Sequence, residues 1–131
     1  PMKVSSHGSI RRAMLLAGRG YKERDRERHG KIIFALEKET SYFRRLGSAA
    51  IMLASVAAGR ADSVILTGSQ TWDMAAGALL VQEAGGTTTE YCGKPWDIGS
   101  EDLVATNGAI HGELIAITNN KANYDCDDGS V

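Results

Sequence analysis

Residues 72–86 constrain the fold of this chain more strongly than any other stretch of comparable length. Thr71 suits a helix N-cap, Asp73 places a negative charge in the first turn, and a glycine pair ends the run. A strand-like run at residues 61–67, with Val, Ile and Leu at positions 64–66, precedes this helix, and a β-branched run at residues 86–91 follows it. The sequence therefore predicts a strand–helix–strand unit here.

The same alternation of strand-like and helical runs extends over nearly the whole chain. It favours an α/β fold, in which a layered mixed or largely parallel sheet is flanked by helices. The predicted strands are residues 2–5, 13–18, 42–46, 61–67, 86–91 and 103–106, and the predicted helices are residues 21–39, 50–58, 73–84 and 109–118.

Composition excludes some classes of partner. The 131 residues include 15 basic and 16 acidic side chains, so the net charge of −1 gives no electrostatic reason to expect nucleic acid or a membrane surface as a partner. No apolar stretch is long enough to span a bilayer. Cys92 and Cys126 lack metal-ligand spacing, which predicts two reduced thiols in a cytoplasmic protein.

The most charged stretch is residues 22–28, where basic and acidic side chains alternate. Alternating signs favour a solvated helix face over a nucleic-acid interface. His7, His29 and His111 have no common spacing that would bring them to one metal, so the sequence assigns them no role.

Two strand-to-helix junctions have the chemistry of an anion site. One is the turn Gly47–Ser48–Ala49, and the other leads through Trp72 to Asp73. Free backbone N–H groups at a helix N-terminus bind anions, and ligands in α/β sheets gather at such junctions. A carboxylate at one junction and bare amides at the other would suit a metal-bound phosphate ester.

These junctions carry a resemblance to a known family. Residues 44–50 (RRLGSAA), 56–62 (VAAGRAD) and 72–86 resemble the C-terminal half of the inositol monophosphatase family of magnesium-dependent phosphomonoesterases. The resemblance runs from about residue 2 to residue 118. It implies that residues 1–118 form the C-terminal domain of such an enzyme. Residues 119–131 are polar, which predicts a disordered tail.

The resemblance also implies roles for individual residues. Asp73 would ligate Mg²⁺, which activates water to hydrolyse a sugar or polyol phosphate monoester. Gly47, Ser48 and Ala49 would form the substrate loop, and Trp72 would support the carboxylate. The alternative for Trp72 is a core indole unrelated to the site. Family members are commonly homodimers, so a homodimer is expected here.

Two departures from the family pattern limit these expectations. The Asp-Pro-Ile-Asp-Gly-Thr-type motif of the N-terminal half is absent, and no Asp-Pro occurs anywhere in the chain. We therefore expect the isolated chain to lack catalytic residues and to be inactive. Leu66 stands where inositol-specific members carry glutamate, which leaves the phosphate ester open. Replacement polar contacts could come from Thr67, Ser69 or Gln70.

A function from another class is also compatible with the sequence. The chain could be a non-catalytic dimerisation or partner-binding module that keeps the fold without the chemistry. The residues that distinguish the two functions are the remaining metal ligands of the family. A protein that contains them is expected to be an enzyme.

Overall fold

The computed structural model describes residues 1–40, 42–69 and 71–121, and within these ranges it leaves out the side chains of Thr71, Asp73 and Lys121. This part of the chain contains five strands and four α-helices, which alternate except that β4 and β5 are consecutive. In order they are β1 (Met14–Arg19), α1 (Glu23–Glu37), β2 (Tyr42–Arg45), α2 (Ala49–Ala57), β3 (Ser63–Thr67), α3 (Thr71–Glu83), β4 (Thr87–Thr89), β5 (Leu103–Thr106) and α4 (His111–Lys121), with a short 3₁₀ turn at Ile10–Arg12 before β1.

The strands form one mixed sheet in the order β2-β1-β3-β5-β4. Strands β2, β1 and β3 run parallel, with α1 and α2 as their crossovers, whereas β5 is antiparallel to both β3 and β4. This arrangement confirms the predicted α/β fold with a mixed sheet and flanking helices.

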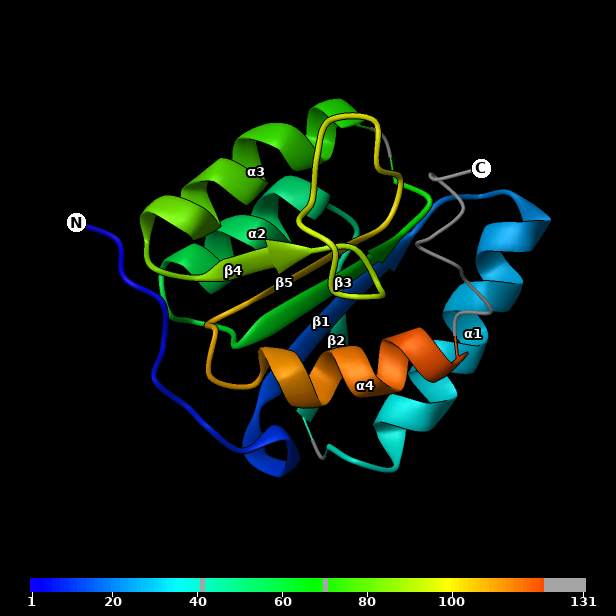
Figure 1. Ribbon diagram of the computed structural model, residues 1–131, viewed down its shortest axis with the longest axis horizontal. Coiled ribbons are helices and arrows are strands. Elements are labelled where there is room, and N and C mark those ends of the chain that lie inside the picture. Colours follow the sequence, from blue (N-terminus) through cyan, green and yellow to red (C-terminus); the bar gives the residue numbers. More distant parts are fainter. Residues whose placement is uncertain (41, 70, 122–131) are drawn as a thin grey trace.

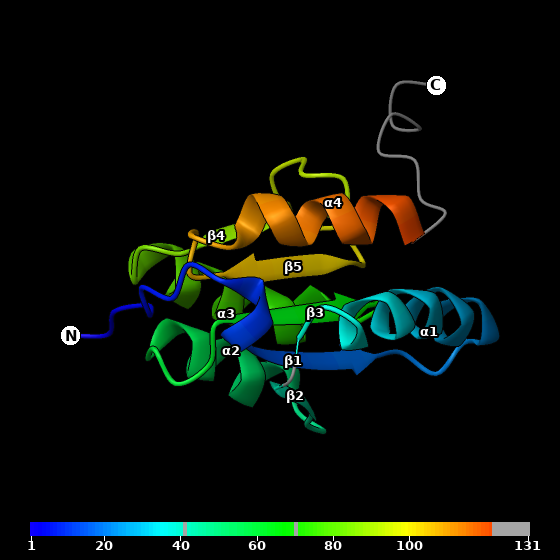
Figure 2. The same ribbon diagram turned by 90° about the horizontal axis from the view of Figure 1, so that it is seen from below.

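Helices cover both faces of the sheet (Figures 1 and 2). Because successive side chains of a strand point to opposite faces, Leu16 and Leu66 pack with α2 and α3, whereas Leu15 and Ile65 pack with α1 and α4. Helices α2 and α3 lie so close that a Cβ added to Gly77 would stand 2.5 Å from Cδ1 of Leu53. Glycine at position 77 therefore allows α2 and α3 to pack closely.

Some predicted element boundaries were wrong. Residues 2–5 form no strand; instead the Val4 N–H donates to the Ala84 carbonyl (3.1 Å), so this segment lies against the end of α3. Helix α4 continues to Lys121, three residues beyond its predicted end. Most of the predicted tail, residues 122–131, lies outside the described residues.

Two further findings concern the cysteines and membrane spans. Cys92 is disulfide-bonded, which contradicts the predicted reduced thiol, and Cys126 lies outside the described residues. Within the described ranges, no helix combines the length and apolar character needed to cross a membrane.

Candidate functional site

A pocket of about 710 Å³ lies at one edge of the sheet and is named here the strand-end pocket. Its wall is formed by the carboxyl ends of β1, β2 and β3 and by the segments that follow these strands. Glu101, which lies just before β5, completes the wall. The lining residues are Gly18, Arg19, Gly20, Tyr21, Lys22, Asp25, Arg45, Leu46, Gly47, Ala49, Met52, Leu66, Gly68, Ser69 and Glu101.

The position of this pocket follows from the sheet topology. The three parallel strands β1, β2 and β3 deliver their carboxyl ends to one edge. Strand β5 is antiparallel to β3, so its amino end, preceded by Glu101, reaches the same edge. Ligand sites in open α/β sheets lie at the carboxyl ends of the strands, which makes the strand-end pocket the candidate site.

The structure places the predicted substrate loop at the pocket. Gly47 and Ala49 line it, while Ser48 lies between them as the N-cap of α2, its Oγ accepting the Ile51 N–H at 3.2 Å. Leu66 also lines the pocket and is only 1% exposed. The position that differs from inositol-specific members therefore contributes an apolar wall.

The structure describes only part of the second predicted junction, which leads through Trp72 to Asp73. Ser69 lines the pocket, and helix α3 begins two residues later, so Asp73 lies in its first turn. The Asp73 side chain lies outside the described part of the structure, and so does Gln70. Trp72 does not line the pocket and is 84% exposed, so the alternative of a core indole is wrong.

Buried polar contacts fix the loop that connects β3 to α3. The Gly68 N–H donates to Oδ1 of Asp102 (2.9 Å), and the Ser69 N–H donates to the Glu101 carbonyl (2.9 Å). Gly68 has a φ of +66°, and an added Cβ there would collide with the Asp25 carboxylate. Glycine at this position is therefore required by both the backbone conformation and the close approach of Asp25.

An ion-pair cluster lies beneath this loop. Arg28 pairs with Asp102 and lies 3.5 Å from Asp25, and all three side chains are buried. Although burial opposes its charge, the hydrogen bond and attraction to Asp102 raise the pKa of Arg28. Burial raises the pKa of Asp102, while Arg28 and the Gly68 N–H counteract that rise.

The predicted solvated face of residues 22–28 is confirmed for five of the seven residues, which are exposed, but it is wrong for Asp25 and Arg28. Asp25, Arg28 and His29 are buried, as are Ile32 and Leu36 further along α1. The spacing of these five positions follows a helical face, which is a signal that the sequence does contain. It was missed because charged side chains at positions 25 and 28 mask it.

His29, predicted to have no role, is fully buried beside the same loop. Its Nδ1 hydrogen-bonds to Oγ1 of Thr67 (2.9 Å), and Thr67 in turn bonds to the Tyr91 hydroxyl. Within the described residues its Nε2 has no partner. Burial, followed by repulsion from Arg45 and Arg19, lowers the pKa of His29 to about 4.

His29 should make the stability of the fold fall with acidification. Its pKa is about 4 in the folded chain and about 6.5 when unfolded, so the unfolded state binds more protons between these values. We expect the free energy of unfolding to drop by about 3 kcal/mol between pH 7 and pH 4 from this group alone. Urea unfolding of the 131-residue chain at several pH values measures it.

A comparison of two His→Gln variants separates the effect of His29 from that of other titrating groups. One such group is His111, because burial lowers its pKa as well. His29→Gln should flatten the pH dependence, while His7→Gln, which changes an exposed residue, should leave it unchanged. Equal slopes for the wild type and His29→Gln would contradict the assignment.

A complete metal centre is not formed by the side chains that the structure describes: no three of their His, Cys, Asp and Glu groups converge on one point. Asp73 offers one carboxylate from the first turn of α3, where its backbone is placed. Mg²⁺ is commonly held by one or two carboxylates together with waters and phosphate oxygens. The chain therefore fits part of a magnesium site.

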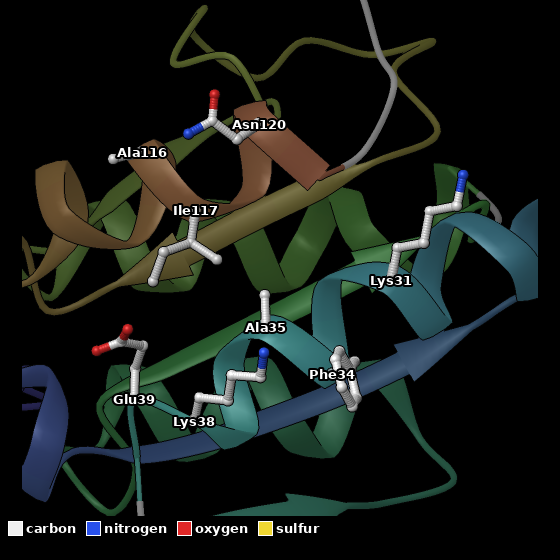
Figure 3. A pocket seen from close by; sticks show the side chains of 8 residues that line it. All are labelled: Lys31, Phe34, Ala35, Lys38, Glu39, Ala116, Ile117 and Asn120. Atoms are coloured by element: carbon white, nitrogen blue, oxygen red, sulfur yellow. The ribbon is translucent and has the colours of Figure 1, made fainter.

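A second hollow lies between α1 and α4, on the face of the sheet opposite α2 and α3 (Figure 3). Phe34, Ala35 and Ile117 give it apolar walls, and Lys31 with Lys38 supplies charge. It contains none of the predicted site residues, and it does not lie at the carboxyl ends of the parallel strands. The strand-end pocket remains the candidate site.

Comparison with known proteins gives related matches in sequence and structure. The sequence description of the inositol monophosphatase family matches residues 1–123. The chain is 42% identical over 90 residues to a fructose-1,6-bisphosphatase/inositol-1-monophosphatase of Thermotoga maritima, covering 69% of this chain and 35% of that protein. It is 39% identical over 111 residues to the Nus factor SuhB of Pseudomonas aeruginosa, covering 81% of this chain and 40% of that protein.

A solved structure gives the same result. The inositol monophosphatase from Anabaena superposes with a TM-score of 0.83 and 35% sequence identity, over 92% of this chain and 50% of that one. The chain thus spans half or less of the length of each of these three relatives. Because the family match covers nearly all of its residues and the fold agrees, the chain belongs to the inositol monophosphatase family.

Proposed function

We propose that this chain forms the substrate-pocket domain of a Mg²⁺-dependent phosphatase that hydrolyses a sugar or polyol phosphate monoester. The observation that carries the proposal is the strand-end pocket, which is bounded by Gly47 and Ala49 and leads through Ser69 into the helix that bears Asp73. Membership of a family of phosphatases supports hydrolysis as the reaction class. The proposed domain covers residues 1–118.

Asp73 is proposed as a metal ligand. When bound, Mg²⁺ would polarise the phosphate and activate the attacking water. A carboxylate is a hard oxygen ligand, and in the first turn of α3 its charge also favours the helix dipole. We assign Trp72 a supporting role beside Asp73. The Trp72 indole is exposed in this chain. It can therefore hold Asp73 in place only when another protein surface packs against the indole.

Gly47, Ser48 and Ala49 are proposed to hold the ester. The backbone N–H groups at the start of α2 are suited to an anionic oxygen, and the Ser48 hydroxyl is already used to cap the helix. Leu66 and Met52 give the pocket an apolar wall. Because Leu66 offers no acceptor for a substrate hydroxyl, we propose that inositol 1-phosphate is not the preferred substrate.

The test compares the 131-residue chain with the product of the complete reading frame. We expect phosphate release with millimolar Mg²⁺ from the complete product and none above blank from the 131 residues, because their sequence lacks the Asp-Pro-Ile-Asp-Gly-Thr-type motif that carries further metal ligands in the family. Release of inorganic phosphate from a panel of sugar and polyol phosphates measures this. Turnover by the 131-residue chain would contradict the expected inactivity.

A second candidate is a non-catalytic module that binds a partner or a second copy. The similarity to a protein named a Nus factor favours it, and so do exposed apolar side chains at Ile51, Trp72 and Leu79. An inactive complete product that forms dimers would support this candidate over the phosphatase. A homodimer is proposed under both candidates, and the cytoplasmic location stays a prediction.

A further inference from the structure

The loop between β3 and α3 leads directly to the proposed metal ligand. Strand β3 ends at Thr67 and helix α3 begins at Thr71, so residues 68–70 are the whole connection. Asp73 follows in the first turn of α3. A connection of three residues has little slack, and a metal ligand has to be held to within about 0.5 Å of its binding geometry. The position of this loop therefore matters for metal binding as well as for folding.

Two hydrogen bonds tie this loop to the segment that leads into β5. The Ser69 N–H donates to the backbone carbonyl of Glu101 (2.9 Å), so this bond does not depend on the side chain at either position. The Gly68 N–H donates to Oδ1 of Asp102 (2.9 Å), so this bond is lost when the side chain at position 102 has no acceptor. Asp102 therefore fixes the loop through its side chain.

Arg28 in turn fixes the Asp102 carboxylate. The guanidinium of Arg28 pairs with Asp102 and lies 3.5 Å from Oδ1 of Asp25. Arg28 and Asp102 are both buried, so water competes little for these bonds. The Asp25 carboxylate also lies against Gly68, where it would collide with an added Cβ. One arginine on α1 thus holds both carboxylates that approach Gly68.

Stability alone does not explain three buried charged side chains at this place. A buried ion pair can often be replaced by apolar side chains of similar volume without loss of stability, because taking charges out of water is itself costly. The cluster also lies at the candidate site, since Asp25, Gly68 and Glu101 line the strand-end pocket. Hydrogen-bonded partners in the outer shell of a metal site orient its ligands. These observations favour a role in positioning the loop that leads to Asp73.

We propose that Asp102, held by Arg28, is a positioning residue for Asp73. It holds the β3–α3 loop so that the first turn of α3 presents the Asp73 carboxylate to the metal. Neither Asp102 nor Arg28 binds the metal itself, because both act through the Gly68 N–H. The proposal rests on the proposed function, in which Asp73 is a metal ligand, and it deepens that function by naming the residues that set the position of the ligand.

Two double variants that carry the same charge test this role. Arg28→Met/Asp102→Asn keeps an oxygen acceptor for the Gly68 N–H, whereas Arg28→Met/Asp102→Leu has a side chain of similar shape without one. Both are made in the product of the complete reading frame, and Mn²⁺ binding is followed by the relaxation of water protons. We expect the dissociation constant for Mn²⁺ to be about tenfold higher in the leucine variant than in the asparagine variant, since outer-shell partners contribute about 10- to 100-fold to metal affinity. The asparagine variant should bind Mn²⁺ as the wild type does.

A control variant separates positioning from a general loss of stability. Ile32→Val removes one carbon from a core residue of α1, so it should lower stability and leave the Mn²⁺ affinity unchanged. In the 131-residue chain without metal, the amide chemical shifts of Trp72 and Met74 report the position of the first turn of α3. They should change in the leucine variant and not in the asparagine variant. If leucine at position 102 prevents folding, alanine makes the same comparison, because it also lacks an acceptor.

Equal Mn²⁺ affinity of the two double variants would overturn the positioning role. So would Mn²⁺ binding that Ile32→Val weakens as much as the leucine variant does, because a loss of stability would then explain both. Failure of the proposed function gives a different result, in which Asp73→Asn binds Mn²⁺ as tightly as the wild type and both proposals are wrong. Weaker binding by Asp73→Asn, together with equal binding by the double variants, would overturn the positioning role alone.

Discussion

Asp73→Asn in the product of the complete reading frame should lower kcat by at least about 100-fold, because changes to the outer shell of a metal site already cost about 10- to 100-fold. The substitution keeps the size and polarity of the side chain in the first turn of α3 while removing its charge. Steady-state phosphate release as a function of Mg²⁺ concentration measures both kcat and the Mg²⁺ midpoint, which should rise.

The control is Glu83→Gln, which makes the same charge change on the same helix at an exposed position ten residues further on. It should leave kcat and the Mg²⁺ midpoint unchanged. Thermal unfolding of Asp73→Asn should stay close to the wild type, since the first-turn charge contributes about 1 kcal/mol or less. Full activity of Asp73→Asn at an unchanged midpoint would remove Asp73 from the metal site.

Arg28→Met should destabilise the 131-residue chain by about 3–5 kcal/mol at pH 7, the cost of leaving a buried carboxylate without its partner. Two buried carboxylates, Asp102 and Asp25, lose their ion pair with Arg28 in this variant. The loss should be smaller at pH 5, because burial raises the pKa of Asp102 and, without Arg28, this carboxyl can take up a proton and avoid a buried charge. Urea unfolding at the two pH values measures it.

The double variant Arg28→Met/Asp102→Asn distinguishes the ion pair from simple packing. The amide oxygen that replaces the Asp102 carboxylate would still accept the Gly68 N–H, so removing both charges should recover at least half of the lost stability. Arg24→Met, at an exposed position of α1, should change stability by less than about 0.5 kcal/mol. No recovery in the double variant would show that Arg28 acts through packing rather than charge.

The order of the strands and helices could be predicted because it depends on local sequence patterns. Strand β5 was predicted with its observed bounds, and α3 to within two residues at its start, because apolar runs and glycine stops are read within a few positions. Residues 2–5 look equally strand-like, yet they form no strand. A segment forms a strand only where it can hydrogen-bond to a free edge of the sheet, and the local sequence pattern does not show whether such an edge is within reach.

The candidate site was predictable only in part, for a similar reason. Gly47 and Ala49 were recognised from their motif, and the structure places both at the strand-end pocket. Arg19 and Arg45 were not recognised, because they are 26 residues apart and are brought to one edge only by the parallel pairing of β1 with β2. Isolated arginines in a sequence carry no sign of such convergence.

The sequence by itself determined the family, the alternation of strands and helices, and the absence of a glutamate at Leu66. These are properties of residue type and spacing along the chain. Only the tertiary structure decided that Asp25, Arg28 and His29 are buried beneath the β3–α3 loop, and that three basic side chains line the strand-end pocket. Burial and electrostatic fields depend on which segments pack together, so long-range contacts fix them and local sequence does not.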